Sequence, residues 1–426
     1  MIRKIISNSI ILFCFYVYLF PFKAYGFEPR IIVFLIYIIL YIKPHRIKQI
    51  KIPFRYNKLL YIPLLVGLTS IVTLCINGTM DLAFVIYPFQ IIYLLLLSYC
   101  IFKIITHYTG EISFEIISTY FIRTLLLQAF ITITMFLNPP INDFLFNLQG
   151  IDETSWVIEM YKGKRLIGLG CFYFGGGLIY GLGLIIIMSL LLNYKNKRNS
   201  IILMLEYILI FIVGICIART CLVGAAISFL MVLIKLFHRK INKYVLNICF
   251  KFFTFILAIT FSLVFMYSIS PKIQDEYGMI IDFGFEAFIN YAEEGKLETA
   301  SSEGLKTLYN WPTETKTYFI GDGRFIGDNG DGYYKHTDVG YLRLIYYFGL
   351  LGLLLIILQN WYILNYLKDY WPTRKSNCLS TVIFIYFLLL NLKGYIDMTP
   401  YLFLYLHCHL YNLSQKYEEN KNYILC

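Results

Sequence analysis

The residue types best suited to catalysis lie in one stretch, from Gly321 to Gly352, which reads GDGRFIGDNGDGYYKHTDVGYLRLIYYFGLLG. Histidine can act as a base near neutral pH, and a nearby carboxylate can orient the imidazole or raise its basicity. His336 and Asp338 are therefore candidate catalytic residues. Thr337 or Asp338 is also a candidate N-cap for a helix that begins at Val339. The two roles are compatible, because a cap would hold a catalytic histidine in place.

The same stretch carries two arginines that suit an anionic ligand. Arg324 follows Gly321-Asp322-Gly323, and such a loop can present backbone N–H groups and a guanidinium to an anion, unless it is a solvated turn. Arg343 lies in the apolar segment after the loop, near the expected membrane surface, where a lipid-linked anion would lie. The acidic residues of the loop do not have the spacing of a calcium-binding loop, so we predict no metal site.

Arg219 interrupts a long apolar run, 200–237, in which Glu206 is the other main interruption. At ~1.5 Å per residue this run is roughly twice the thickness of the hydrocarbon core, so we predict two helices with Arg219 at a tight hairpin. A charge in a membrane hairpin is costly unless it meets a partner or a polar cavity. A guanidinium matches phosphate or carboxylate, so Arg219 is a candidate catalytic and anion-binding residue. The alternative is an arginine that only reaches the membrane surface.

Arg165 stands at the start of another apolar run, 166–193, and we expect it to open a membrane span. The run is rich in glycine, which lets helix backbones approach closely, and three consecutive glycines can also break a helix at a cavity. The glycines are Gly168, Gly170, Gly175, Gly176, Gly177, Gly181 and Gly183. Arg165 is therefore a candidate ligand-binding residue, or an interfacial charge beside a closely packed helix.

The elements that must position these residues are membrane helices. Hydrophobic residues make up 58% of the chain and charged residues 15%, whereas an average soluble domain is roughly half apolar and a quarter charged. The excess comes in long blocks, so we predict an all-α polytopic membrane protein of about 12 transmembrane helices with one large, partly helical extracytoplasmic loop. The predicted spans are 5–22, 30–43, 59–76, 82–102, 116–137, 166–193, 200–217, 219–237, 245–269, 339–365, 378–394 and 398–413.

Positive charge predicts the orientation of these spans. If the N-terminus is a retained helix that starts in the cytoplasm, the inside loops carry more Lys and Arg than the outside loops, and both termini are cytoplasmic. Residues 1–269 then hold the first nine spans, 270–338 the extracytoplasmic loop, and 339–426 the last three spans and a cytoplasmic tail, within one integral membrane domain. In the loop we expect an amphipathic helix over 280–306 that is broken by Asn310-Trp311-Pro312.

Taken together, these features resemble the O-antigen polymerase (Wzy-type) and O-antigen ligase superfamily of bacterial membrane glycosyltransferases. The end of the loop resembles the superfamily pattern of a polar cluster, a Gly-Tyr-Leu run and a helix with spaced glycines, here His336, Asp338, Gly340, Tyr341, Gly349 and Gly352. Gly321-Asp322-Gly323 resembles an upstream Gly-x-Gly, and Ala218-Arg219-Thr220 resembles the Ser-Arg-Thr start of a family helix. Arg165-Leu166-x-Gly168 resembles an Arg-x-x-Gly opening, although the usual following Pro-Asn is absent.

The resemblance implies a metal-independent enzyme without a cofactor, which moves a glycan from undecaprenyl pyrophosphate to an acceptor sugar at the outer face of the bacterial plasma (inner) membrane. It implies that outside arginines bind the pyrophosphate and that a histidine serves as base, and Tyr341 joins the candidate substrate contacts. The implied anion-binding residues are Arg165, Arg219, Arg324 and Arg343, with His336 as base. The implied partners are the lipid-linked glycan donor and acceptor, membrane lipid and a chain-length regulator protein, and no nucleic acid.

Three functions fit these features in different degrees. The polymerases join lipid-linked repeat units of O-antigen, capsule or exopolysaccharide, whereas the ligases transfer finished glycan to another acceptor. The motif at the end of the loop looks more like that of the polymerases; it reads Thr337-Asp338-Val339-Gly340-Tyr341. A flippase or transporter of lipid-linked sugars is the third alternative. A transporter would be expected to carry charges at mid-span and repeated halves, and the sequence has neither.

Overall fold

The computed structural model describes residues 2–41, 57–151, 165–193, 197–237, 270–296, 299–327, 332–371 and 378–424, with isolated positions between 250 and 269. All regular secondary structure in these residues is helical, which confirms the all-α prediction. The helices form two compact units, residues 1–31 with 118–302 and residues 32–117 with 303–426. This division differs from the three consecutive segments expected from the sequence, because each unit combines segments that are far apart along the chain.

Membrane character resides in six helices of the described chain that are long and apolar enough to cross a membrane. They are α3 (Asn57–Asn77), α4 (Tyr87–Thr109), α5 (Phe114–Leu137), α8 (Tyr173–Leu191), α9 (Lys197–Ile217) and α15 (Gly340–Leu367). Shorter apolar helices are α1 (Ile2–Leu19), α2 (Arg30–Tyr41), α10 (Cys221–Phe237) and α16 (Cys378–Leu390), and α17 (Thr399–Ile424) ends the described chain. The described residues thus contain six helices of this length and not the expected count of about 12 spans. The span expected at 245–269 lies largely outside the described residues.

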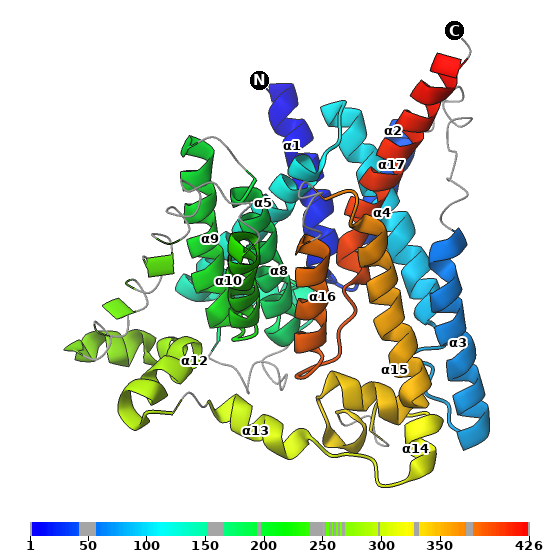
Figure 1. The fold of residues 1–426 in the computed structure, drawn as a ribbon. Coiled ribbons are helices and arrows are strands. Elements are labelled where there is room, and N and C mark those ends of the chain that lie inside the picture. Colours follow the sequence, from blue (N-terminus) through cyan, green and yellow to red (C-terminus); the bar gives the residue numbers. More distant parts are fainter. Residues whose placement is uncertain are drawn as a thin grey trace. The chain divides into compact units, whose positions relative to one another are not determined.

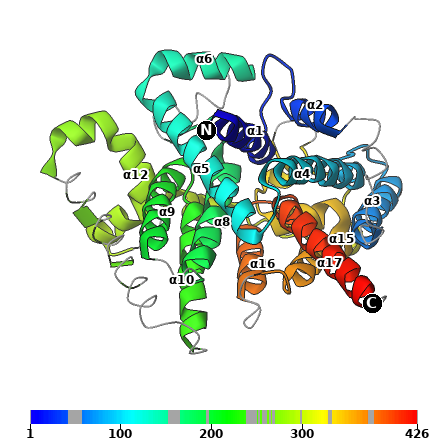
Figure 2. The same ribbon diagram turned by 90° about the horizontal axis from the view of Figure 1, so that it is seen from above.

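Helix α8 forms the buried centre of the first unit. It is apolar on every side, so it is stable only where neighbouring helices cover it, and every residue from Gly176 to Leu191 is buried. Figures 1 and 2 show α9 and α10 beside it. A Cβ on Gly224 of α10 would overlap the backbone of Gly181 of α8, so the glycines permit close contact between the helices. The glycines at 175–177 lie within the unbroken α8 and do not break it.

The segment before α8 corrects one expectation. Arg165 does not open a helix, because α8 begins only at Tyr173. The intervening residues form a tight turn in which Gly168 and Cys171 exchange both backbone hydrogen bonds, each 3.1 Å long. Gly170 in this turn has a φ of +66°, a conformation that glycine adopts without steric cost. The turn therefore needs its glycines, which interrupt the apolar run before the helix can start.

The α9–α10 hairpin agrees with the prediction. Helix α9 ends at Ile217 and α10 begins at Cys221, so the turn consists of residues 218–220 with Arg219 at its centre. The Cys221 N–H donates to the Ala218 carbonyl over 3.0 Å and closes the turn. A single continuous helix would have buried this guanidinium in the middle of a span, which is why the chain turns at this point.

The amphipathic segment 280–306 is two helices instead of one. Helix α12 (Pro271–Glu294) ends at Gly295, which has a φ of 71° and donates its N–H to the Tyr291 carbonyl. This is a left-handed glycine C-cap, and it ends the helix before the position that the apolar pattern suggested. Helix α13 (Ala300–Leu308) then follows. The described residues of segment 270–338 thus include α12, α13 and α14 (Thr315–Phe319), and its expected place outside the membrane stays a prediction.

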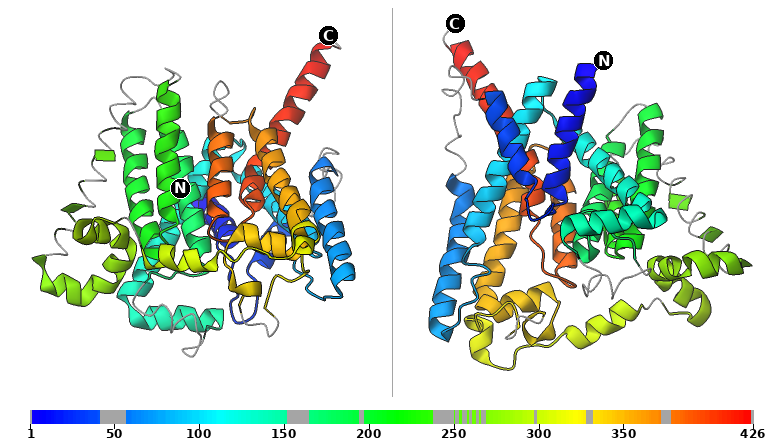
Figure 3. Two further views of the ribbon diagram at one scale, coloured as in Figure 1. Left: turned by 60° about the horizontal axis from the view of Figure 1, so that its bottom comes forward. Right: turned by 180° about the vertical axis from the view of Figure 1, so that it is seen from behind.

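In the second unit α15 changes direction near its start, as Figures 1 and 3 show. Phe348 and Gly349 have non-helical dihedral angles, and Gly349 has a φ of 70°. The apolar segment predicted as one span, 339–365, therefore consists of a short first part that carries Arg343 and a longer second part. The helix begins at Gly340 after Val339, and no side chain caps it, so the N-cap role considered for Thr337 or Asp338 is wrong.

Candidate functional site

The candidate site residues fall into two groups, one in each compact unit. The first unit holds Arg165 and Arg219, and the second holds Arg324, His336, Asp338, Tyr341 and Arg343.

Arg165 and Arg219 come together over one aromatic ring. The guanidinium carbon of Arg165 lies 4.1 Å from the centre of the Phe283 ring, and that of Arg219 lies 4.6 Å from it. Both distances are within the range of cation–π attraction. Two cations that share one ring repel each other, so the arrangement favours an anion beside them.

Backbone contacts explain how these three residues meet. The Leu166 N–H donates to the Cys216 carbonyl over 3.0 Å, which ties the segment after Arg165 to the end of α9, just before the Arg219 turn. Helix α12 approaches the same end of α9 through Gly284, where a Cβ would lie 3.3 Å from Ile215. Phe283 is the residue next to that glycine, so the packing of α12 on α9 places its ring near both guanidiniums.

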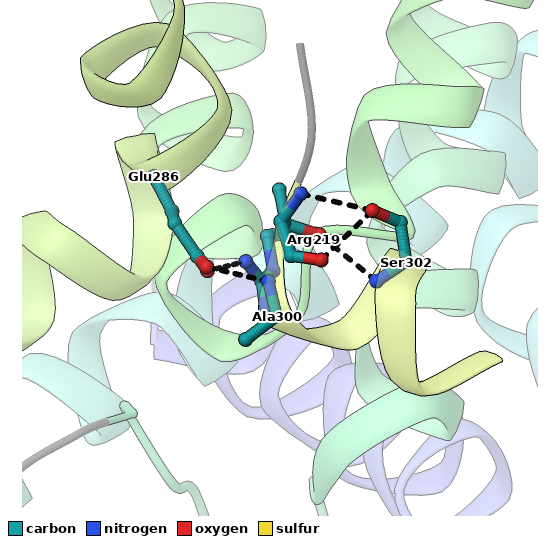
Figure 4. Close-up of polar contacts among 5 residues, drawn as sticks. Arg219, Glu286, Ala300 and Ser302 are labelled. Atoms are coloured by element: carbon teal, nitrogen blue, oxygen red, sulfur yellow. Dashed lines mark hydrogen bonds and ion pairs between the residues drawn. The ribbon is translucent and has the colours of Figure 1, made fainter. Parts of the chain in front are cut away.

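Glu286 supplies an anion within the first group. Its Oε2 forms an ion pair with Nη1 of Arg219, whose side chain is only 10% exposed. Its Oε1 accepts a hydrogen bond of 2.6 Å from the N–H of Ala300, the first residue of α13 (Figure 4). Thr299 and Ser302 close that end of the helix, since each backbone N–H donates to the other's hydroxyl. Glu286 therefore joins α12, the Arg219 turn and the start of α13.

The electrostatics of Arg219 fit a site for anions. Burial and, to a smaller degree, the positive charge of Arg165 together lower the pKa of its guanidinium to about 10. Arg219 is still protonated near neutral pH, so two positive charges are held close together. The Glu286 carboxylate offsets part of this charge, and an anion with more negative oxygens, such as a pyrophosphate, would offset more of it.

Arg343 lies in an aromatic sandwich in the second unit. The guanidinium carbon is 3.7 Å from the centre of the Phe325 ring and 3.5 Å from that of Tyr333. The residue is 8% exposed, and its Nε has no hydrogen-bond partner among the described residues. Because both faces of the guanidinium are covered, only its edge remains for an anion.

The glycine-rich loop before Arg324 is built differently from the expected anion cradle. The N–H groups of Asp322 and Gly323 donate to the Tyr346 and Tyr347 carbonyls, over 2.6 Å and 3.0 Å, at the kink of α15. The N–H groups of Phe325 and Ile326 donate to Oδ2 of Asp81, over 2.7 Å and 3.1 Å. These four N–H groups are occupied, so the expectation that the loop backbone binds an anion is wrong for them.

Close backbone contact explains the glycine at Gly321. A Cβ at this position would lie 2.5 Å from the Tyr347 carbonyl group, and its φ is +81°. Asn77 and Thr73 of α3 donate to the Gly321 and Ile320 carbonyls, over 3.0 Å each, and hold the loop from the other side. Arg324 is thus held on an ordered loop, with its guanidinium carbon 6.0 Å from the centre of the Tyr334 ring.

His336 and Asp338 lie in an exposed segment. His336 and its neighbour Lys335 both have left-handed backbone, with φ of 50° and 55°. In the described part of the chain no hydrogen bond joins the His336 imidazole to the Asp338 carboxylate, so this structure does not show the orienting contact that the sequence suggested. Partial loss of hydration raises the pKa of Asp338, opposed by the charges of Arg343 and Lys393.

Tyr341 has a hydrogen bond that anchors its ring. Its hydroxyl donates to the Leu388 carbonyl over 2.7 Å, and the side chain packs against the buried cluster of Val339, Leu342, Ile345 and Tyr346. For metals, the described residues hold no group of three or more His, Cys, Asp or Glu side chains suited to binding an ion.

Sequence reasoning missed Phe283, Glu286 and the two rings around Arg343. The aromatic and acidic residues of α12 were visible as an amphipathic pattern, but this pattern does not tell which of them meets an arginine. Comparison of the chain with family models, with curated proteins and with solved structures finds no match.

Proposed function

We propose that this protein is an oligosaccharide repeat unit polymerase, a glycosyltransferase that joins undecaprenyl-pyrophosphate-linked units of O-antigen, capsule or exopolysaccharide. The observation that carries the proposal is the pair of guanidiniums, Arg165 and Arg219, over the Phe283 ring at a hairpin of apolar helices. A membrane protein rarely keeps two such charges together unless an anion meets them. The pyrophosphate of a membrane-bound lipid carrier is such an anion.

In the proposed reaction, Arg165 and Arg219 act on the leaving group and His336 acts on the acceptor. An acceptor hydroxyl attacks the anomeric carbon of the donor sugar, the bond from that carbon to the pyrophosphate oxygen breaks, and undecaprenyl pyrophosphate leaves with the electron pair. Arg165 and Arg219 stabilise the charge that develops on the leaving group, since preorganised charges act where charge appears in the transition state. His336, which is exposed, takes the proton of the acceptor hydroxyl.

The second unit holds the remaining candidate contact residues. Asp338 accepts a hydrogen bond from the acceptor sugar, Tyr341 offers its ring, and Arg324 and the edge of Arg343 attract anionic groups. The sandwich of Phe325 and Tyr333 supports this role of Arg343, because two rings that hold a guanidinium fix the plane in which it can donate.

The proposed location is the outer face of the bacterial plasma membrane, with both termini in the cytoplasm. The excess of Lys and Arg in the loops that would then be cytoplasmic supports this orientation. A chain-length regulator protein is the proposed partner, since a polymerase alone does not define where a chain stops.

Deletion of the gene, followed by gel analysis of surface glycan, tests the function. Loss of a polymerase should leave single repeat units attached to the surface. Unattached polymer would instead indicate a ligase, and repeat units trapped inside the cell a flippase. Full-length polymer with normal attachment would contradict all three functions.

Complementation of the deletion strain tests the site. Arg219→Ala should insert normally but leave single repeat units. A matched control is Arg123→Ala, which removes an exposed arginine of α5 that also lies near an aromatic ring, Tyr120, at 5.7 Å. The control should restore polymer of normal length, and polymer of normal length with Arg219→Ala would refute the site.

A further inference from the structure

We propose that Glu286 is an internal anion that occupies the Arg219 side of the anion site and must leave before a ligand pyrophosphate can bind there. The identity of the ligand as a pyrophosphate rests on the proposed function, whereas the contacts of Glu286 do not. In this state the site is closed by the protein's own carboxylate.

The contacts of Glu286 are those that a phosphate group would make. One carboxylate oxygen forms an ion pair with the Arg219 guanidinium, and the other accepts from the backbone N–H of Ala300 at the start of α13. Guanidinium groups and helix N-terminal amides are the donors that proteins use to bind phosphate. Figure 4 shows the Glu286 carboxylate at these two donors, and we infer that an anionic oxygen of a ligand would lie there.

The charge balance favours exchange of one anion for another. Glu286 brings one negative charge to a place where two guanidiniums lie within 5 Å of one ring centre. A pyrophosphate brings more negative charge and more acceptor oxygens than a carboxylate, so it competes well for the same donors. The Glu286 side chain is 23% exposed, and it can therefore move into water when it is displaced.

Displacement of Glu286 also changes the contacts of α13. In the closed state Glu286 of α12 satisfies the N–H of Ala300, which has no partner within its own helix. When Glu286 moves away, that N–H becomes available to the ligand or to water, and the link between α12 and the start of α13 is lost. Ligand binding is thus coupled to the hydrogen bond between Glu286 and Ala300. A bound ligand weakens this hydrogen bond, and the hydrogen bond weakens ligand binding by the same free energy.

A simpler role for Glu286 would be to hold Arg219 in the orientation that binds ligand. The two roles predict opposite results when the charge is removed. A positioning carboxylate makes ligand binding weaker when it is lost, whereas a competing carboxylate makes ligand binding tighter.

Calorimetric titration of inorganic pyrophosphate into the purified full-length protein distinguishes these roles. Glu286→Gln keeps an acceptor for the Ala300 N–H but removes the charge, and we expect it to bind pyrophosphate about tenfold more tightly than the wild type, the size expected for a charged hydrogen bond. The matched control is Asp282→Asn, which removes one charge from an exposed position one turn earlier on α12. The control should stay within about twofold of the wild type, because it leaves the Arg219 pair intact.

A second background shows whether the effect passes through Arg219. When Arg219 is changed to Gln, Glu286 no longer has a guanidinium to occupy, so Glu286→Gln should then change the affinity by less than about twofold. If Glu286→Gln does not fold, Glu286→Asp provides the test. Its shorter side chain cannot reach both donors, and we expect about threefold tighter binding.

Equal or weaker binding by a folded Glu286→Gln protein would overturn the proposal, as would a wild type and variant that both fail to bind pyrophosphate. The failure of the proposed function is a separate result. A deletion strain with normal polymer, combined with tighter binding by Glu286→Gln, would remove the polymerase and keep the internal anion. A loss of polymer with no gain in affinity would keep the polymerase and remove the internal anion.

Discussion

Arg165 and Arg219, which are far apart in the sequence, lie at 4.1 Å and 4.6 Å from the centre of the same Phe283 ring. The ring offers each guanidinium a partner that carries no net charge. It therefore lets two cations stay close together, while the Glu286 carboxylate pairs with Arg219.

Replacement of Phe283 by leucine should weaken pyrophosphate binding while the protein still folds. The leucine fills most of the space but has no ring, so both cation–π contacts are lost, each worth about 0.5–1 kcal/mol. We expect an affinity about five- to thirtyfold lower by calorimetric titration. Phe285→Leu, which also removes a buried ring from the same helix, is the control, and its affinity should stay within about twofold of the wild type. Equal losses in the two variants would mean that the ring acts only through packing.

The contact between α8 and α10 predicts that Gly224→Ala destabilises the protein. The new Cβ would meet the backbone of Gly181, which cannot rotate away as a side chain can. Overpacking of this kind costs about 1–3 kcal/mol, and it should appear as a lower unfolding temperature in detergent. Gly175→Ala is the matched control, because a Cβ at that position of α8 meets nothing within 4 Å. It should leave the unfolding temperature unchanged or raise it, since alanine favours a helix more than glycine.

The left-handed backbone at Lys335 predicts a stabilising substitution. A non-glycine residue with a φ of 55° pays a steric cost of roughly 1–2 kcal/mol that glycine avoids. Part of this gain is lost because glycine makes the unfolded chain more flexible, so we expect Lys335→Gly to stabilise by about 0.5–1 kcal/mol. Thermal unfolding measures the change. Lys316→Gly within α14 should instead destabilise, and a lower unfolding temperature for Lys335→Gly would show that the loop is not strained there.

The environment of Asp338 predicts a pH dependence of stability. A carboxyl whose pKa is raised in the folded protein binds protons more readily there than in the unfolded chain. Its contribution to stability is therefore greatest at acidic pH and is lost as the pH rises through the folded pKa. Asp338→Asn cannot lose a proton, so its unfolding temperature should exceed that of the wild type near pH 7, and the difference should shrink as the pH falls toward 4. A difference that is constant across this range would contradict the shifted pKa.

Several features of this protein could be predicted from the sequence because they depend on local properties of the chain. The apolar composition predicts helices that cross a membrane, and a run too long for one span with a single arginine near its middle predicts the hairpin at Arg219. Each of these depends on a length or a charge that can be read within one segment.

Other features were decided by contacts between distant segments. The same glycine-rich pattern fits an anion cradle and a loop that binds the kink of α15, and only the hydrogen bonds of Asp322 and Gly323 to the Tyr346 and Tyr347 carbonyls distinguish the two. In the same way, α12 has several aromatic and acidic residues, and only its packing on α9 selects Phe283 and Glu286 as the partners of Arg219. A periodic pattern defines which residues share a face of a helix, whereas the partner of that face depends on tertiary packing, which brings together residues that the chain keeps far apart.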